Sequence, residues 1–554
     1  MRIPCTPPAC SELQYEPMPR MNDRLHKFYG IVNLMKISTS TSTSILISTF
    51  VLTFECLAGQ NGRIDIRDVG AIGDGKTMNT HAIQMAIDSI ANGGGGMVCV
   101  PPGVFMTGTL QLRSNVNIYL ESGAVVKGSA NLNDYFLNGK KVGLFFTQDA
   151  ENVSITGHGM IDGNGDSFMV LDSAKKMDHA GVMWTRQGDQ FRHVSEGLGD
   201  GPLVPKDRPF QMIIFSDCRK VTILDVSITN SPFWTLHLAD CDGIILSGLR
   251  IWGNLFVPNN DGMDLTSCSN AIISDCDIRT GDDCIVLTGY NHHFDLPGYK
   301  FLKRTCENIT VNNCTLVSRS AAIRIGGFDQ NPMRNFTFSN IVITNSNRGI
   351  GLFVRDQGGI ENVIFSNILI ETHLFTGDWW GNGEPIQLSS IRLTKDVPLG
   401  KMKNIKFEHV VCKGESGIFV YGTDESVIED VSFTDVRFHL ADGKLNDVSG
   451  GNFDLRPVLD PKRSLFSHDI PGFYGQYVKN LRIEDFDLIW DPMKETYFTN
   501  GIEVHNFEGL DIVRFHGTGS PGNSNARPIV LEDGTEYEVT PGNVAVVKKN
   551  VEEK

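Results

Sequence analysis

The chain has 554 residues, of which 57 are glycine and 21% are charged, and its formal net charge is −16 at pH 7. This length is sufficient for a large buried core in one domain or in several. The negative charge argues against nucleic acid or an anionic membrane surface as a partner, because both would repel it. An anionic substrate would need basic side chains placed locally in its binding site.

The first sixty residues differ in composition from the rest. Lys36 precedes a Ser/Thr tract, an apolar run at 45–52 and a small-residue exit at Gly59. This layout is typical of a secretory signal peptide and is too short for a membrane span. We therefore expect 1–34 to be a non-structural upstream extension, 35–59 to be a signal peptide, and the mature protein to be secreted or periplasmic without a membrane span. The alternative is a genuine N-terminal extension.

One sequence pattern recurs from about residue 152 onward: a turn residue, often Asn or Asp, followed by a short β-branched run. Asn308, Asn335 and Asn362 are spaced 27 residues apart. A period in the twenties, with strands and no helices, predicts an all-β solenoid of the parallel β-helix type. Asn tolerates the left-handed backbone that a tight turn requires. The predicted turn positions are Asn152, Lys220, Gly243, Asn270, Asn308, Asn335, Asn362, Asn404, Asp430 and Asn480.

The periodicity divides the chain into parts. We expect an N-terminal cap and first coils at 60–130, with a helix near 81–91, a β-helix catalytic domain at 131–515, and a C-terminal tail or cap at 516–554. Three segments with little periodicity are expected to be loops that wall a binding cleft. They are 165–208, 288–304 and 370–387.

Nine of the 12 cysteines follow the first sixty residues. Cys218, Cys241, Cys268 and Cys306 each stand two residues before a turn position, so we expect them to stack as a buried ladder of small side chains. The cysteine spacings fit no zinc pattern. We predict no metal site and no cofactor.

Two acidic motifs stand in strand-like surroundings. Asp261 and Asp264 belong to the first, and Asp282 and Asp283 follow Gly281 in the second. Stacked coils of about 21 residues would place Asp261 beside Asp282, on strands roughly 4.8 Å apart, and Asp283 joins them only if the backbone bends at Gly281. Carboxylates in a cleft, one protonated and the others ionised, could hydrolyse a glycosidic bond. The alternatives are turn-forming acids on a solvated face and a calcium site.

The residue sequences of these motifs resemble those of a known family. The similarity lies in four segments: Asn-Asn-Asp-Gly-Met-Asp at 259–264, Thr-Gly-Asp-Asp-Cys-Ile at 280–285, and the segments 159–165 and 231–237. The chain is similar here to glycoside hydrolase family 28, the polygalacturonase-like pectinases. The resemblance covers about 62–515. It implies a right-handed parallel β-helix and hydrolysis with inversion of configuration. By motif position it implies that Asp282 is the general acid and that Asp261 and Asp283 activate water.

Two departures from the family pattern concern the substrate. The family histidine position holds Ala321, and the family's Arg-Ile-Lys phrase, which grips the substrate carboxylate, reads Gly351-Leu352-Phe353 here. A carboxylate needs an arginine or lysine partner. We therefore expect the chemistry to be retained and the sugar in the central subsite to differ.

Five residues are candidates for substrate binding. Arg324 and Arg355 could replace the missing charges from other positions, Asp264 belongs to the acidic cluster, Trp234 could form a stacking floor, and His292 could border the cleft. The alternative for both arginines is a solvated strand edge, and for Trp234 a place in the core.

We predict an exported glycoside hydrolase, monomeric, that cleaves a pectin-like or related polysaccharide or oligosaccharide. Two alternatives remain: a carbohydrate-binding β-helix protein with little turnover, and a calcium-dependent polysaccharide lyase. The long loops favour a closed cleft end and exo action, while the sugar and the linkage stay open.

Overall fold

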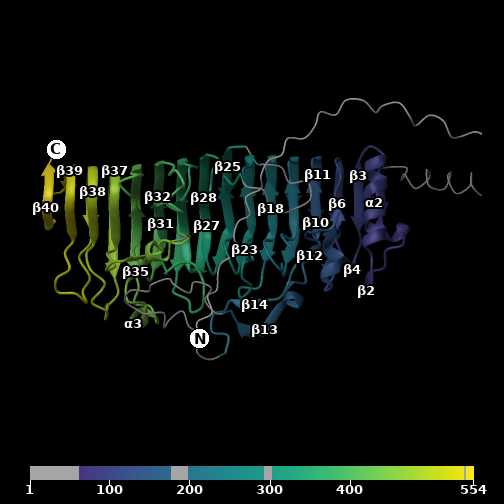
Figure 1. Cartoon of the computed structure of the whole chain (residues 1–554), viewed down its shortest axis with the longest axis horizontal. Helices are drawn as coiled ribbons and strands as arrows, with labels where there is room; N and C mark the ends of the chain where they lie inside the picture. Colours follow the sequence, from purple (N-terminus) through teal and green to yellow (C-terminus); the bar gives the residue numbers. More distant parts are fainter. Residues whose placement is uncertain are drawn as a thin grey trace, which may run out of the picture. The chain divides into compact units, whose positions relative to one another are not determined.

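The computed structural model describes residues 62–175, 197–291, 302, 304–458, 460–541 and 544–553, all of which belong to the unit 58–554. The predicted extension at 1–34 and signal peptide at 35–59 lie outside the described residues. Most strands of the unit join one parallel sheet that is wound into stacked coils (Figure 1). The predicted all-β parallel β-helix is confirmed.

The coils form three ladders of parallel strands, and the first ladder runs from one end of the sheet to the other. In stacking order its strands are β1 (Arg63–Asp65), β3 (Gly96–Val100), β6 (Val116–Leu120), β11 (Glu151–Gly157), β16 (Arg219–Leu224), β19 (Asp242–Ser247), β22 (Ser269–Ser274), β25 (Cys306–Asn312), β28 (Met333–Ser346), β30 (Ile360–Thr372), β32 (Met402–Gly414), β34 (Ile428–Leu440), β37 (Phe473–Trp490), β38 (Ile502–His516), β39 (Ile529–Thr540) and β40 (Val546–Glu553).

The other two ladders are shorter and merge into long strands of the first. The second consists of β2 (Asp74–Met78), β4 (Gly103–Thr107), β7 (Ala124–Gly128), β12 (Met160–Asp162), β17 (Ser227–Thr229), β20 (Arg250–Trp252), β23 (Asp277–Thr280) and β26 (Thr315–Ser318), which pairs with β28. The third consists of β5 (Leu110–Gln111), β10 (Phe145–Gln148), β15 (Ile213–Ser216), β18 (Leu236–Ala239), β21 (Met263–Thr266), β24 (Ile285–Thr288), β27 (Ala321–Gly327), β29 (Arg348–Val354), β31 (Ile386–Ser390) and β33 (Ile418–Tyr421), which pairs with β37.

Short elements project from the coils. Among the described residues, three antiparallel strand pairs and five helices of three or four residues lie outside the ladders, and Figure 1 shows β13, β14, β35 and α3 along one edge of the stack. No helix among the described residues is long and apolar enough to cross a membrane. The elements are β8 (Phe136–Leu137) with β9 (Lys140–Lys141), β13 (Met169–Ala174) with β14 (Leu203–Pro205), β35 (Asn452–Asp454) with β36 (Leu465–Ser467), α3 (Asn446–Ser449), and the 3-10 helices at Ile66–Val69, Leu132–Tyr135, Gly165–Phe168 and Pro461–Arg463.

A helix closes the N-terminal end of the stack. Helix α2 (Thr80–Asn92) buries Ile83, Ala86, Ile87 and Ile90, which recur at the spacing of one helical face. This face covers the apolar interior that the first coil would otherwise leave open to water. The predicted helix near 81–91 is confirmed.

The predicted turn positions all adopt the left-handed backbone, and the asparagines among them bond from coil to coil. Asn335 has a φ of 61°, and its Nδ2 donates to Oδ1 of Asn308 at 3.0 Å. The same bond joins Asn362 to Asn335 at 3.1 Å and Asn404 to Asn362 at 2.8 Å. The amide ladder therefore helps to fix the register of successive coils.

The predicted cysteine ladder is present as well. Cys218, Cys241, Cys268 and Cys306 are free thiols with no exposed surface, one on each of four successive coils. The Sγ of Cys241 donates to the carbonyl oxygen of Ala239 at 3.4 Å. These cysteines are small core residues, as the sequence predicted.

Two predicted domain boundaries do not mark breaks in the sheet. Strand β7 pairs directly with β12, so the coils continue across residue 130. Strands β39 and β40 add two further parallel rungs after β38, so paired strands continue beyond residue 515, in the segment predicted to be a C-terminal tail or cap. The short, charged repeats of this end hid its strand periodicity.

A stack of phenylalanines fills the interior of the later coils. Phe338, Phe365, Phe407 and Phe433 lie in successive rungs, and neighbouring ring centroids are 4.8 Å apart. All four side chains have no exposed surface. The interior therefore depends on identical residues meeting at identical positions of the coil.

We predict that Phe365→Ala lowers the free energy of unfolding by about 3–5 kcal/mol, because it removes a ring from both faces of the stack and leaves a cavity. Urea unfolding followed by circular dichroism measures this change. Ile364→Ala is the matched control, since Ile364 lies on the same strand with 39% of its surface exposed, and it should change stability by about 1 kcal/mol or less. Equal effects of the two substitutions would contradict the prediction.

Candidate active site

The two acidic motifs meet at the start of neighbouring strands of the third ladder. Asp261 precedes β21, and Asp282 and Asp283 precede β24. The register offset between these strands is 22 residues, one more than predicted, so Asp283 lies level with Asp261, and Gly262 N donates to the carbonyl oxygen of Asp283 at 2.9 Å. Asp282 precedes the strand, where side chains need not alternate. Carboxylate oxygens of all three residues lie within 4.8 Å of one another.

Hydrogen bonds hold Asp282 on both its side chain and its backbone. Its Oδ2 accepts from Asn259 N at 3.2 Å, and its Oδ1 accepts from Asp283 N at 3.1 Å. Its carbonyl oxygen accepts from the hydroxyls of Thr280 at 2.6 Å and Ser318 at 2.7 Å. The carboxyl group is therefore fixed in place before any substrate binds.

Asp283 is held by two donors from the next coil. Its Oδ1 accepts from Ala321 N at 2.8 Å, and its Oδ2 accepts from Arg324 Nη1 at 3.2 Å. Ala321 occupies the position where the family pattern has a histidine. Both oxygens of Asp283 are thus oriented without that histidine, by a backbone N–H and a guanidinium group.

The carboxyl groups of the cluster are buried together. Burial and the charge of Asp283 raise the pKa of Asp282 to about 7, against a smaller lowering by Arg324. Burial, and next the charge of Asp282, raise the pKa of Asp261, and burial raises that of Asp264. Such groups titrate as a unit. The cluster therefore retains protons at neutral pH, and Asp282 changes its charge near neutrality.

Arg324 supplies the positive charge beside these acids. Its Nη1 donates to Asp283, its Nη2 donates to the Tyr290 hydroxyl at 2.9 Å, and its Nε donates to the Gly326 carbonyl at 3.0 Å. A guanidinium group has five N–H donors, so these bonds engage three of them. Its side chain is 12% exposed.

The departures from the family's basic phrase have a structural explanation. Gly351 pairs in register with Arg324, and a Cβ placed on Gly351 would lie 2.5 Å from the ring of Phe353. That ring is buried between two guanidinium groups, at 5.1 Å from Arg348 and 5.2 Å from Arg355. An aromatic side chain fills the space, and Arg324 presents its charge from the preceding coil.

A cavity of about 540 Å³ opens beside the acidic cluster. The loops after β13 and after β30 supply part of its wall, as predicted for 165–208 and 370–387. Its lining residues are Lys175, Pro202, Trp234, Pro258, Asn259, Asp261, Asp282, Tyr290, Arg324, Phe328, Asp378, Trp379 and Trp380.

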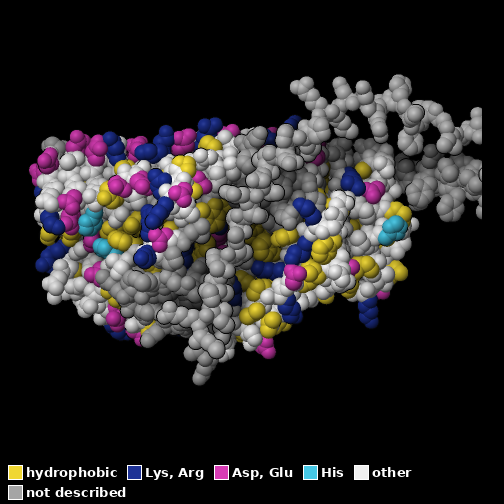
Figure 2. All heavy atoms as spheres, viewed as in Figure 1, with side chains coloured by type: hydrophobic (Ala, Val, Ile, Leu, Met, Phe, Trp, Pro, Cys, Tyr) yellow, Lys and Arg dark blue, Asp and Glu magenta, His cyan; other side chains and the backbone are white. Residues whose placement is uncertain are grey.

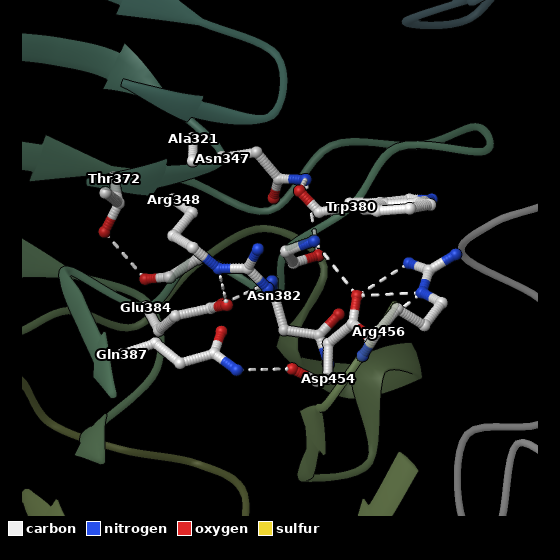
Figure 3. Close-up of polar contacts among 12 residues, drawn as sticks. Ala321, Asn347, Arg348, Thr372, Trp380, Asn382, Glu384, Gln387, Asp454 and Arg456 are labelled. Atoms are coloured by element: carbon white, nitrogen blue, oxygen red, sulfur yellow. Dashed lines mark hydrogen bonds and ion pairs between the residues drawn. The ribbon is translucent and has the colours of Figure 1, made fainter. Parts of the chain in front are cut away.

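The aromatic part of the wall is supported from behind by buried charges. Arg456 Nη2 donates to the Trp379 carbonyl at 2.8 Å and to Asp454 Oδ2 at 2.7 Å. Asp454 Oδ2 also accepts from Gly381 N at 3.0 Å. Figure 3 shows these groups between the hairpin β35–β36 and the segment that carries Trp380. The wall segment is thus bonded through its backbone to a second part of the chain.

The prediction that Arg355 binds substrate is wrong. Its side chain has no exposed surface, and burial lowers its pKa to about 9. It donates to the carbonyl oxygens of Val354, Ser389, Leu455 and Pro457 at 2.8–3.1 Å, and to the Ser389 hydroxyl. Arg355 links the coils to the hairpin β35–β36 through hydrogen bonds. It therefore lies neither in the cavity nor at a solvated strand edge.

The structure places the other predicted binding residues as follows. Trp234 and Arg324 line the cavity, while Asp264 is 2% exposed and lies behind it, which corrects its expected contact with substrate. His292 lies outside the described residues. The Trp234 ring meets His237 edge-on at 5.1 Å, and burial lowers the pKa of His237 to about 3, so this imidazole is neutral.

Several cavity residues were not predicted from the sequence. The Trp379-Trp380 pair gave a signal, since adjacent tryptophans are unusual in a polar loop, and Asp378 precedes them. Tyr290 and Lys175 gave none, because their positions depend on how the loops fold back over the coils.

We predict that Asp282→Asn stabilises the protein more at pH 8 than at pH 4. The pKa of Asp282 is about 7 in the folded chain and 3.8 ordinarily. The folded chain therefore binds more protons between these values, and stability falls as the pH rises through them. Asparagine removes this loss, so the gain in Tm should be larger by about 1–4 °C at pH 8. Calorimetry measures both gains.

The matched control is Asp396→Asn, since Asp396 is exposed on a loop and its substitution should shift Tm equally at both pH values. An equal gain for Asp282→Asn at pH 4 and pH 8 would mean that the folded structure does not hold its carboxyl group protonated, which would contradict the prediction.

With this geometry established, the chain can be compared with known proteins. It is 28% identical over 246 residues to a protein of Vitis vinifera named "Probable polygalacturonase" and 28% identical over 258 residues to an exo-poly-alpha-D-galacturonosidase of Dickeya chrysanthemi. The first alignment covers 41% of this chain and 44% of the relative, and the second covers 40% and 41%. The chain thus spans less than half the length of these two relatives.

Solved structures agree in fold. The family 28 exopolygalacturonase of Yersinia enterocolitica matches with a TM-score of 0.58 and 15% identity, over 85% of this chain and 80% of that one. The exopolygalacturonase of Thermotoga maritima matches with a TM-score of 0.50 and 22% identity, over 68% and 87%. Residues 94–357, which contain both acidic motifs, match the family described as Glycosyl hydrolases family 28. The segment with both acidic motifs is therefore similar to glycosyl hydrolase family 28.

Proposed function

We propose that the chain is a glycoside hydrolase that cleaves a pectin-like polysaccharide, or an oligosaccharide derived from it, with inversion of configuration. The observation that supports this most is Asp282, a fixed carboxyl group with a pKa of about 7 at the wall of the cavity. A second carboxyl group, Asp261, lines the same cavity. A proton donor and an adjacent base are what glycosidic hydrolysis requires.

Asp282 is assigned the role of general acid. Its proton passes to the glycosidic oxygen as the bond from that oxygen to the anomeric carbon breaks, and the carboxylate remains. A water molecule adds to the anomeric carbon from the other side and gives one proton to a carboxylate of the pair Asp261 and Asp283. Asp261 and Asp283 are assigned to hold that water. The Oδ1 of Asp261, which has no hydrogen-bond partner in the described structure, is the acceptor that a water could use.

The stereochemical part of the proposal rests on which oxygens are engaged. Inverting enzymes typically separate their carboxyl groups by about 6.5–9.5 Å, whereas oxygens of this cluster lie within 4.8 Å. A retaining mechanism would need one carboxylate to attack the sugar directly. Both oxygens of Asp283 already accept hydrogen bonds, and Asp261 is only 3% exposed. Attack by a water held between them accounts for this arrangement better.

A uronic acid is the sugar that the cavity charges favour. Arg324 has two N–H donors that the bonds described above do not engage, and a charged fork of this kind pairs with a carboxylate. Lys175 adds a second cation to the lining, and Trp234, Trp379 and Trp380 offer flat surfaces to a sugar ring. In a chain with a net charge of −16, these local cations provide the attraction that an anionic substrate needs.

Export and a monomeric state complete the proposal. They rest on the signal-peptide pattern at 35–59 and on a sheet whose coils are built from strands of a single chain. The walls from two long loops favour attack at a chain end, which the name of the Dickeya chrysanthemi relative also suggests.

The test is hydrolysis of uronic and neutral oligosaccharides by the purified chain, with the first product analysed by proton NMR. We expect release of a sugar with inverted configuration, and kcat/KM that falls about tenfold per pH unit above pH 7, because ionised Asp282 cannot donate a proton. Asp282→Asn should lower kcat by about 10²–10⁴-fold. Asp396→Asn is the control and should leave kcat unchanged.

Three outcomes would count against the proposal. Full activity of the Asp282 variant would remove its assigned role, and a product of retained configuration would remove the inverting mechanism. Oligosaccharide binding without any release of sugar would favour the alternative of a binding protein.

We further predict that Arg324→Gln lowers kcat/KM about 10–100-fold more on a uronic oligosaccharide than on its carboxyl-reduced counterpart. A hydrogen bond between charged groups contributes about 1.5–3 kcal/mol, and only the uronic substrate can form it. Comparing the two substrates separates this effect from any disturbance of Asp283, which would lower both rates alike. Arg279→Gln, on an exposed strand position, is the control. An equal loss on both substrates would contradict a carboxylate contact.

A further inference from the structure

A cluster of two histidines and a glutamate lies on the C-terminal coils, outside the cavity. His468 follows β36, and Glu503 and His505 lie on β38. The Nε2 atoms of His468 and His505 are 3.2 and 2.8 Å from the same Oε1 of Glu503. One ligand atom from each residue lies within 4.8 Å of the others. Figure 2 shows histidine side chains at the surface of this end of the stack.

The outer nitrogen of each imidazole faces a second oxygen. His505 Nδ1 is 3.5 Å from Glu532 Oε2 on β39, and His468 Nδ1 donates to the Asp469 carbonyl at 2.5 Å. The other oxygen of Glu503 accepts from Asn500 Nδ2 at 2.6 Å. Histidines that bind metals are typically oriented in this way, by an acceptor at the nitrogen that does not bind.

Counting donors and acceptors shows what the cluster lacks. The four contacts of the imidazole nitrogens described above are to oxygens that only accept, so a neutral imidazole with its proton on Nδ1 directs the Nε2 lone pair at a carboxylate oxygen. His468 donates from Nδ1 to the Asp469 carbonyl, so either a second proton or a cation must lie between its Nε2 and Glu503. A neutral His505 can donate to Glu503 from Nε2 or, with its proton on Nδ1, share that cation. One divalent ion would accept the lone pairs of both Nε2 atoms and would face the charge of Glu503, while Glu532 pairs with Lys549.

The spacing suits a small ion. Bonds of about 2.0–2.1 Å in a tetrahedral site place ligand atoms roughly 3.3 Å apart, and the two nitrogen–oxygen separations here are 3.2 and 2.8 Å. Aromatic rings surround His468, with centroids at 5.0 Å for Phe466, 4.7 Å for Tyr474 and 6.4 Å for Phe453. These rings limit water access on one side, while side-chain exposures of 23% for His468 and 19% for His505 leave an entry path.

We propose that His468, Glu503 and His505 bind a divalent transition-metal ion, with zinc as the best fit to two imidazoles and one carboxylate. The ion fastens the segment after β36 to the coil of β38. The sequence prediction of no metal relied on the cysteine spacings. These spacings cannot reveal such a site, because its ligands are His and Glu residues from two segments 35 residues apart. The proposal is independent of the proposed hydrolysis.

The location gives the ion a structural consequence. The hairpin β35–β36 that precedes His468 carries Asp454, and Arg456 follows its first strand. These two residues bond the backbone of the wall segment at Trp379 and Gly381. An ion at His468 therefore stabilises the same hairpin that supports one wall of the cavity.

The test uses the full chain without an affinity tag, dialysed against zinc and then against metal-free buffer. Elemental analysis should find one zinc per chain, and calorimetry should find one site at micromolar zinc. A chelator should lower the Tm of the wild type, because an ion that binds only the folded chain stabilises it. His468→Ala with His505→Ala should lose the zinc and the response to chelator.

His409→Ala is the matched control, because His409 forms an exposed pair with Asp435 and its removal should leave both readouts unchanged. Glu503→Gln keeps the shape of the site and should weaken zinc binding at least tenfold. Circular dichroism of each variant without zinc confirms that it is folded. A wild type that retains no zinc, or a double variant that binds zinc as the wild type does, would overturn the proposal in favour of two protonated histidines around Glu503.

Discussion

The parallel register between successive coils is the constraint on which the rest of this structure depends. Turn residues such as Asn335 hold the left-handed backbone and bond to the same residue of the neighbouring coil. Stacked rings such as Phe365 and Phe407 repeat the same alignment inside. Because every ladder strand inherits this register, a shift by one residue would exchange core and surface positions throughout a coil. The acids meet only because the register does not shift.

The same register explains how the cation beside the acids can come from a different coil than in the family pattern while the acids keep their positions. Val286 pairs with Arg324, and Arg324 pairs with Gly351, so these positions form one row along the third ladder. The family pattern expects a cation at Gly351, and this chain has one at Arg324 instead, a coil earlier. Glycine and Phe353 fill the vacated volume. A stacked fold permits such an exchange because neighbouring rungs present their side chains to the same side.

Much of this arrangement was predictable from the sequence, and the failures have a common cause. The repeat gave the fold and each turn position, since local spacing determines them. The motifs gave Asp261, Asp282 and Asp283, although the offset was one residue too small. Arg355 was misplaced because burial depends on which segments cover a strand, and the covering hairpin lies about 100 residues away. Contacts of that range leave no trace in a local pattern.

Two buried arginines, Arg348 and Arg456, contact the segment that carries Trp379 and Trp380, and their positions indicate a fixed wall. Arg348 pairs with Glu384 at 2.5 Å with both side chains almost fully buried, and Arg456 pairs with Asp454 at 2.7 Å (Figure 3). Buried ion pairs contribute little net stability, but breaking one leaves an uncompensated charge. Movement of the segment at 378–384 would separate Glu384 from Arg348 and would break the bonds from Arg456 to the Trp379 carbonyl and from Gly381 N to Asp454. The backbone that carries Trp379 and Trp380 is therefore held in place by bonds within the chain, and the proposed sugar-binding surface is formed before any ligand is present.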